Sequence, residues 1–259
     1  MKQRTKRAVG DIPGLELHWS SNVVKWIGFV CILFGTFSTA VIQLGILGLD
    51  LNAGEEVLTA ISESDKLTFW ANLAAAFTMV SYVALPIYAK LAYEGACRTS
   101  NPKLYLVRMI GLALLAEIPY DLTTAGTWNN MGSQNPVWAL ALAVLMLNLF
   151  RQYAQPGPRG SILQCLVMLM AVAWSLVLRS QYGIYTILLA AMFHIFSFKK
   201  SLTTWGGALV CMLQFPAPMG MFAVHWYDGD KGKPNKYLFY VLYLAQLVVF
   251  AALAAILRK

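Results

Sequence analysis

Charged side chains are scarce in this sequence of 259 residues. Asp, Glu, Lys and Arg together make up 12% of the chain, whereas 58% of its residues are hydrophobic. Soluble domains carry about 25% charged residues, so a water-soluble fold is not expected. Hydrophobic runs recur along the whole chain, and each is long enough to cross roughly 30 Å of hydrocarbon as a helix. The composition therefore predicts an all-α integral membrane protein.

Several motifs that carry chemistry are also missing. The sequence has no Cys-x-x-Cys pair, no metal-ligand spacing, no Walker-type glycine pattern and no nucleophile elbow. Its three histidines, His18, His194 and His225, all lie outside the middle of the hydrophobic runs, so a histidine general base within the membrane is not expected. These absences predict a protein without a metal site or a phosphate-binding loop.

The hydrophobic runs are bounded by charged residues or by Pro and Gly clusters. They predict about eight transmembrane helices in one polytopic bundle, with residues 1–22 as a basic cytoplasmic tail and residues 23–259 as a single transmembrane domain. The predicted helices lie near 23–48, 68–95, 104–122, 136–152, 161–179, 183–198, 203–224 and 236–257.

Basic residues indicate the orientation, because short cytoplasmic loops are enriched in Lys and Arg. With eight crossings, the tail, three loops and the last two residues fall on one basic side, whereas Lys66, Arg179, Lys231, Lys233 and Lys236 fall on the other. This distribution predicts both termini in the cytoplasm. The net charge of +8 then reflects topology and attraction to anionic lipids, so no nucleic-acid partner is expected.

Ionisable residues inside the hydrophobic runs are candidates for function, because they are costly at bilayer depth. Lys90 and Glu94 are four residues apart and share one helix face, while Arg108, Glu117 and Asp121 lie on the next predicted helix. One interpretation is a polar site that positions a substrate or passes a proton. The other is structural, with the carboxylates pairing to neighbouring helices and the cations reaching the membrane interface.

Two stretches in the second and third predicted helices carry most of a family resemblance. They are Leu85-Pro-Ile-Tyr-Ala-Lys-Leu-Ala-Tyr-Glu-Gly95, continued by Thr99-Ser-Asn101 and Tyr105-Leu-Val-Arg108, and Glu117-Ile-Pro-Tyr-Asp-Leu122. Weaker similarity continues at Gln134–Pro136, at Tyr182–Gly183, at Tyr227–Gly232 and at Lys236–Tyr243. These stretches resemble the TraX family of conjugal-transfer membrane proteins, whose founding member is described as an acetyltransferase acting on pilin. The resemblance implies a protein of the inner membrane of a bacterium.

The sequence departs from the family at positions where polar catalytic groups are expected. Ser38 and Thr39 stand where the family has an Asp-His pair in its first helix. Gln246 stands in place of a histidine in the last helix, and Gln181 in place of an aspartate. Ser, Thr and Gln donate hydrogen bonds but do not act as a base at neutral pH.

The resemblance implies a transmembrane acyltransferase that moves an acetyl or other acyl group from acetyl-CoA, or another acyl-CoA, to an amine or hydroxyl of a peptide, glycan or lipid. On this reading Glu117, Asp121 and Glu94 are catalytic candidates, and Arg108 and Lys90 bind the CoA phosphates. The expected substrate-binding residues are Tyr88, Tyr120, Ser38, Thr39 and Gln246.

The three departures favour an alternative. A catalytically inactive relative would keep the fold and the polar pocket and would act as a membrane binding or assembly subunit for a partner protein, a peptide or a lipid.

Overall fold

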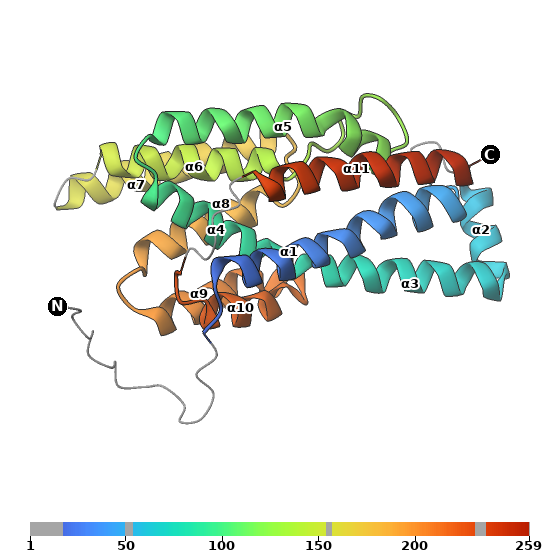
Figure 1. The fold of residues 1–259 in the computed structure, drawn as a ribbon, viewed down its shortest axis with the longest axis horizontal. Coiled ribbons are helices and arrows are strands. Elements are labelled where there is room, and N and C mark those ends of the chain that lie inside the picture. Colours follow the sequence, from blue (N-terminus) through green and yellow to red (C-terminus); the bar gives the residue numbers. More distant parts are fainter. Residues whose placement is uncertain (1–17, 50–53, 154–156, 231–236, 259) are drawn as a thin grey trace, which may run out of the picture.

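The computed structural model describes residues 18–49, 54–153, 157–230 and 237–258, and within these ranges all regular structure is helical (Figure 1). Four helical stretches are long and apolar enough to cross a membrane, namely Ser21–Ile46, Asp65–Arg98, Pro158–Val177 and Leu238–Leu257. The elements are α1 (Ser21–Thr36), the π-helical η1 (Phe37–Ile46), α2 (Glu55–Glu63), α3 (Asp65–Tyr82), α4 (Ala84–Arg98), α5 (Pro102–Thr124), α6 (Val137–Gln152), α7 (Pro158–Val177), α8 (Gly183–Ile195), α9 (Lys200–Cys211), η2 (Met212–Gln214), η3 (Ala217–Met219), α10 (Gly220–Trp226) and α11 (Leu238–Leu257).

Helix α6 lies at the centre of the largest buried cluster and packs against α4, α5, α7 and α8. Ala139, Ala141 and Ala143 of α6 are each at most 3% exposed. Small residues let helix backbones approach closely, which is the usual way that helices associate where there is no water to drive burial. Large apolar side chains such as Leu115 on α5 and Val177 on α7 instead point outward, at 67% and 70% exposure.

Two of the predicted helices are interrupted. The run predicted at 68–95 breaks at Val83, between α3 and α4, because Pro86 has no N–H to donate to the carbonyl of Tyr82. The run predicted at 203–224 breaks between α9 and α10, where Pro216 lies between two short 3₁₀ turns and Pro218 lies within the second. One continuous helix is therefore not formed at 203–224, whereas Asp65–Arg98 remains one helical stretch long enough to cross a membrane, interrupted at Val83.

Helices α9 and α10 pack against each other, so they form a hairpin that enters the bundle and turns back. Its tip, η3, contacts both α3 and α4 at their break. Gly220 follows the tip, and a Cβ atom there would collide with the carbonyl oxygen of Val83 and the ring of Pro86. The two interruptions therefore lie against each other at close backbone distance.

The hairpin returns the chain to the end of the bundle where α1 begins, which we call the Trp19 end. Trp19 N–H donates to Trp226 O at 3.0 Å, and Arg98 Nη1 donates to Gly229 O at 2.6 Å. Helix α11 starts at the same end and runs to the opposite one, the Gly126 end, where Arg258 Nη1 donates to Gly126 O at 3.4 Å (Figure 1).

Within the described residues, this path differs from the predicted one of eight crossings. The described chain runs between the two ends of the bundle seven times, since the α9–α10 hairpin does not cross, and residues 18 and 258 lie at opposite ends. Lys231, Lys233 and Lys236, which were predicted on the outer side, lie outside the described residues, as does most of the tail 1–22. The described residues that flank these lysines, Asp230 and Leu238, both lie at the Trp19 end.

We expect a tag inserted at residues 154–156 and a tag appended after Lys259 to face opposite sides of the membrane. The first connects α6 to α7 at the Trp19 end, and the second follows α11 at the Gly126 end. Protease cleavage of each tag in sealed vesicles of known orientation measures this. Cleavage of both tags from the same side would contradict the path described here.

Candidate functional site

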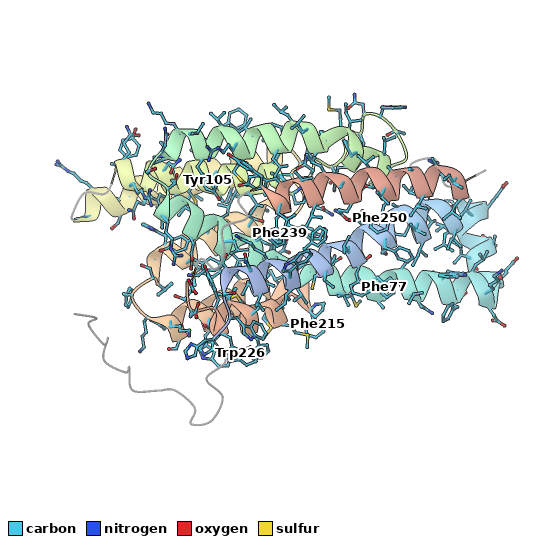
Figure 2. All side chains as sticks on the ribbon, in the orientation of Figure 1. Phe77, Tyr105, Phe215, Trp226, Phe239 and Phe250 are labelled. Carbon is cyan, nitrogen blue, oxygen red and sulfur yellow. The ribbon has the colours of Figure 1, made fainter. Side chains whose placement is uncertain are left out.

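A cavity of about 630 Å³ runs along the inside of the bundle between α1, α3, α4, α5 and α11. Tyr105 on α5 and Phe239 at the start of α11 line it toward the Trp19 end, and Figure 2 labels both. Eight tyrosines belong to its described lining. The lining tyrosines are Tyr82, Tyr88, Tyr105, Tyr120, Tyr182, Tyr227, Tyr240 and Tyr243.

The charged groups of the described lining gather at the Trp19 end. They are Lys25 on α1 and, on α4, Glu94 and Arg98. Glu94 lies 3.1 Å from Arg98 Nη2, and its Oε2 accepts a hydrogen bond of 2.7 Å from the hydroxyl of Tyr227. Burial raises the pKa of Tyr227, with a further contribution from this hydrogen bond, so the hydroxyl stays protonated and donates. This end of the cavity therefore carries a fixed, mainly cationic cluster.

The rest of the lining is uncharged and rich in hydroxyl groups. Thr39, predicted as a substrate-binding residue, faces the cavity, and its hydroxyl bonds only to carbonyls one turn earlier, at 3.3 Å to Gly35 O and 3.2 Å to Thr36 O. Gln181 also lines the cavity, near the Gly126 end. The other small hydroxyl residues of this wall are Thr36, Thr78, Ser81, Thr123, Thr124 and Thr186.

Two predicted substrate-binding residues lie beside the cavity and do not line it. Ser38 is fully buried and ties η1 to α3, since its hydroxyl donates to Ala74 O at 2.7 Å and lies 2.9 Å from the hydroxyl of Thr78. Gln246 is 6% exposed, and neither atom of its amide has a hydrogen-bond partner among the described residues. Its neighbours Tyr243 and Leu247 line the cavity, as do the predicted Tyr88 and Tyr120.

Glu117 lies outside the lining and joins α5 to the start of α6. Its Oε2 accepts hydrogen bonds from Trp138 Nε1 at 2.8 Å and from the side-chain amide of Asn135. Asn135 is fully buried and also donates to Ala113 O at 2.9 Å. A carboxylate held in this way fits the structural interpretation of the sequence.

Asp121 also lies outside the lining and holds the connection between α5 and α6. It is 2% exposed, and its Oδ2 accepts a hydrogen bond of 2.8 Å from the backbone N–H of Asn130. Of the three predicted catalytic carboxylates, only Glu94 therefore faces the cavity.

The two predicted CoA-binding cations point to different places. Lys90 lies 3.7 Å from Glu94 and above the rings of Tyr93 and Phe193, at 5.0 Å and 5.4 Å from their centroids, away from the cavity lining. Arg108 lines a smaller neighbouring cavity of about 420 Å³.

Sequence reasoning missed Lys25, Arg98 and Tyr227 as site residues. In the sequence both cations indicate only topology: Lys25 lies in the first turn of the helix predicted at 23–48, and Arg98 follows the helix predicted at 68–95. Tyr227 was part of a stretch resembling the TraX family, but the fold-back of α10 toward α4 could not be read from the sequence. Within the described ranges, no group of three His, Cys, Asp or Glu side chains is placed to hold a metal ion.

We expect Asn135→Ala to lower the free energy of unfolding by about 1–3 kcal/mol, because it leaves the buried carboxylate of Glu117 with one donor fewer. Thermal unfolding in detergent micelles measures the change. Asn129→Ala, at an exposed position of the same connection, is the matched control and should be neutral. Equal stability of the two variants would contradict a structural role for the Glu117 contact.

Comparison with known proteins yields a match at the family level. The family model described as TraX protein matches residues 20–254, which includes every described helix except the last few residues of α11. No curated protein and no solved structure matches the chain. Because the match extends over most of its length, the chain belongs to the TraX family.

Proposed function

We propose that the protein is a membrane acyltransferase that moves an acetyl or other acyl group from an acyl-CoA to an amine or hydroxyl of a peptide, glycan or lipid. The observation that carries this proposal is the form of the main cavity. It is about 630 Å³ in volume, has Lys25, Arg98 and Glu94 at one end, and is mainly apolar elsewhere, with tyrosine and threonine hydroxyls in its wall. Volumes of this size are typical of sites that enclose small ligands.

The charge distribution suits a CoA thioester. Lys25 and Arg98 at the Trp19 end attract the phosphates, and a guanidinium can bind phosphate oxygens with two hydrogen bonds at once. The uncharged arm and its thioester then extend into the hydroxyl-lined part of the cavity. Hydroxyl donors aimed at the thioester carbonyl stabilise the negative charge that develops on its oxygen during transfer.

Acyl transfer also needs a group that accepts a proton. The acceptor's nitrogen or oxygen forms a bond to the carbonyl carbon, the carbon–sulfur bond breaks, CoA leaves as a thiolate and the nucleophile loses a proton. Glu94 is the carboxylate of the described lining and is our candidate for this role. Arg98 and the hydroxyl of Tyr227 contact its carboxylate and hold it at the cavity wall.

A second candidate function follows from the uncharged interior. Thr39 and Gln181 face the cavity at positions where the resemblance leads us to expect histidine and aspartate. A chain with these residues can still bind a ligand, so the alternative is a binding or assembly subunit for a partner protein, a peptide or a lipid. Loss of a general base typically costs about 10²–10⁴ in rate.

For the orientation, we propose that the Trp19 end faces the cytoplasm and that the membrane is the inner membrane of a bacterium. Arg98, Lys103, Arg151, Lys199 and Lys200 all lie near helix ends at this side of the bundle. Enrichment of Lys and Arg is typical of cytoplasmic loops. Acyl-CoA is a cytoplasmic metabolite in this arrangement and meets the cationic end of the cavity first.

We expect Arg98→Ala to weaken the binding of acetyl-CoA to the purified protein by about tenfold or more, because a charge-assisted contact to phosphate is lost. Calorimetry in detergent measures the affinity. Arg151→Ala is the matched control, since Arg151 is exposed at the same end but away from the cavity, and it should bind as the unmodified protein does. Absence of saturable binding to the unmodified protein at millimolar acetyl-CoA would overturn the proposal.

We expect Thr39→His to raise the rate of acyl transfer by about 10²–10⁴, because it places a base in the cavity at little cost to the local hydrogen bonds. Release of CoA thiol from acetyl-CoA in the presence of amine and hydroxyl acceptors measures the rate, and Ser161→His on the exposed start of α7 is the control. Unchanged transfer in a variant that still binds acetyl-CoA would favour the binding subunit.

A further inference from the structure

A second cavity, of about 420 Å³, lies beside the main one at the Trp19 end. Its described lining contains two guanidinium groups and no carboxylate. Arg98, Tyr105 and Tyr240 line both cavities and form the wall between them. The other residues that line the smaller cavity are Thr99, Ser100, Asn101, Leu104 and Arg108.

Arg108 has an unused guanidinium. It is half-buried on α5 and faces this cavity, and within the described part of the chain it makes no hydrogen bond and no ion pair. The hydroxyl of Tyr240 lies within electrostatic range of it. A half-buried cation without an anionic partner is costly near a membrane, so an anion from outside the chain would stabilise it.

The first turn of α5 adds to the positive potential. Pro102 is the first helical residue, and the side chain of Asn101 caps the helix by accepting a hydrogen bond of 3.0 Å from Leu104 N–H. The start of this 23-residue helix carries the positive end of its dipole and borders the same cavity as Arg108. Two guanidinium groups and a helix start therefore converge on one concave surface.

Arg98 connects this cavity to the segment Trp226–Asp230, which we call the strap. Arg98 Nη1 donates to Gly229 O at 2.6 Å, and Arg98 Nη2 lies 3.1 Å from Glu94. The strap is also held by Trp19 and Ser21, whose N–H groups donate to Trp226 O at 3.0 Å and to Asp230 O at 2.9 Å. Its Tyr227 lines the main cavity. Arg98 thus touches both cavities and the strap.

We propose that the smaller cavity binds a phosphate group between Arg98 and Arg108, and that this binding draws Arg98 away from Gly229 and loosens the strap at the end of the main cavity. Phosphate oxygens are stronger acceptors for a guanidinium than a backbone carbonyl is, and two guanidinium groups hold a phosphate better than one. The phosphate comes from a lipid headgroup or from a soluble phosphate, which share this chemistry. The site does not depend on acyl transfer.

Hydrogen–deuterium exchange of the strap tests this in two arms. In the first, the full-length protein in maltoside micelles, which contain no phosphate, is titrated with inorganic phosphate. In the second, inorganic phosphate is absent and phosphatidylglycerol is added to the same micelles. We expect exchange in peptides covering 226–230 to rise severalfold and saturably in at least one arm, because the N–H of Asp228, bonded to Trp19 O at 3.3 Å, becomes exposed.

Three variants distinguish a specific phosphate site from a non-specific effect of added anions on exchange of the strap. Arg108→Ala should abolish the response while the strap stays protected, because Arg108 does not touch the strap. Arg98→Ala should leave the strap exchanging fast with or without phosphate. Lys103→Ala, which removes an exposed cation one turn away from Arg108, should respond as the unmodified protein does.

The outcomes also separate this proposal from the acyltransferase. A response confined to the first arm identifies a soluble phosphate as the ligand. A response confined to the second arm identifies a lipid headgroup. No response in either arm, or an unchanged response in Arg108→Ala, would overturn the site. Because no acyl-CoA is present, saturable acetyl-CoA binding measured separately would leave the proposed function standing in that case.

Discussion

A bilayer offers no water to backbone groups that a broken helix leaves free, and this constraint organises the fold. The chain interrupts its helices at Val83 and again at Pro216–Pro218, and it places the two interruptions against each other. Gly220 makes this possible, because any side chain there would collide with the carbonyl of Val83. The same break lets α3 and α4 contribute Ser81, Tyr82 and Leu85 to the wall of the main cavity. Packing at the break and the shape of the site are therefore linked.

Polar groups fall into two classes in this molecule. At the Gly126 end, one carboxylate oxygen of Glu117 and one of Asp121 accept hydrogen bonds from α6 or the connection before it, so these groups fix how α5 meets α6, while the other oxygen of each has no partner among the described residues. Those at the Trp19 end, such as Arg98 and Glu94, face open space and touch the strap. A carboxylate with its donors already in place stabilises the fold, whereas a cation beside a cavity is available to a ligand.

The sequence predicted the helices well, because hydrophobic length and the charges at their ends are local properties. It did not predict the hairpin, since hydropathy gives the same signal for a run that crosses and for one that turns back. Pro216 and Pro218 were visible in that run, but only the packing of α10 on α4 shows where the chain goes.

The site residues could be predicted only in part, because contacts between helices are not visible in the sequence. Thr39, Tyr88 and Tyr120 do line the cavity, whereas Glu117 and Asp121 face donors on α6 and its preceding connection, which no spacing within α5 could reveal.

Helix α11 has a consequence for how the protein is made. It is the last helix of the described residues, and it supplies Phe239, Tyr240, Tyr243 and Leu247 to the cavity wall while packing on η1 and α5. During synthesis the ten α-helices that precede it leave the ribosome before this wall exists, so lining surface from α1, α3 and α5 faces lipid or the insertion machinery until residue 257 has emerged. The wall is therefore completed only when α11 inserts between η1 and α5, and Arg258 then donates to Gly126 O at its far end.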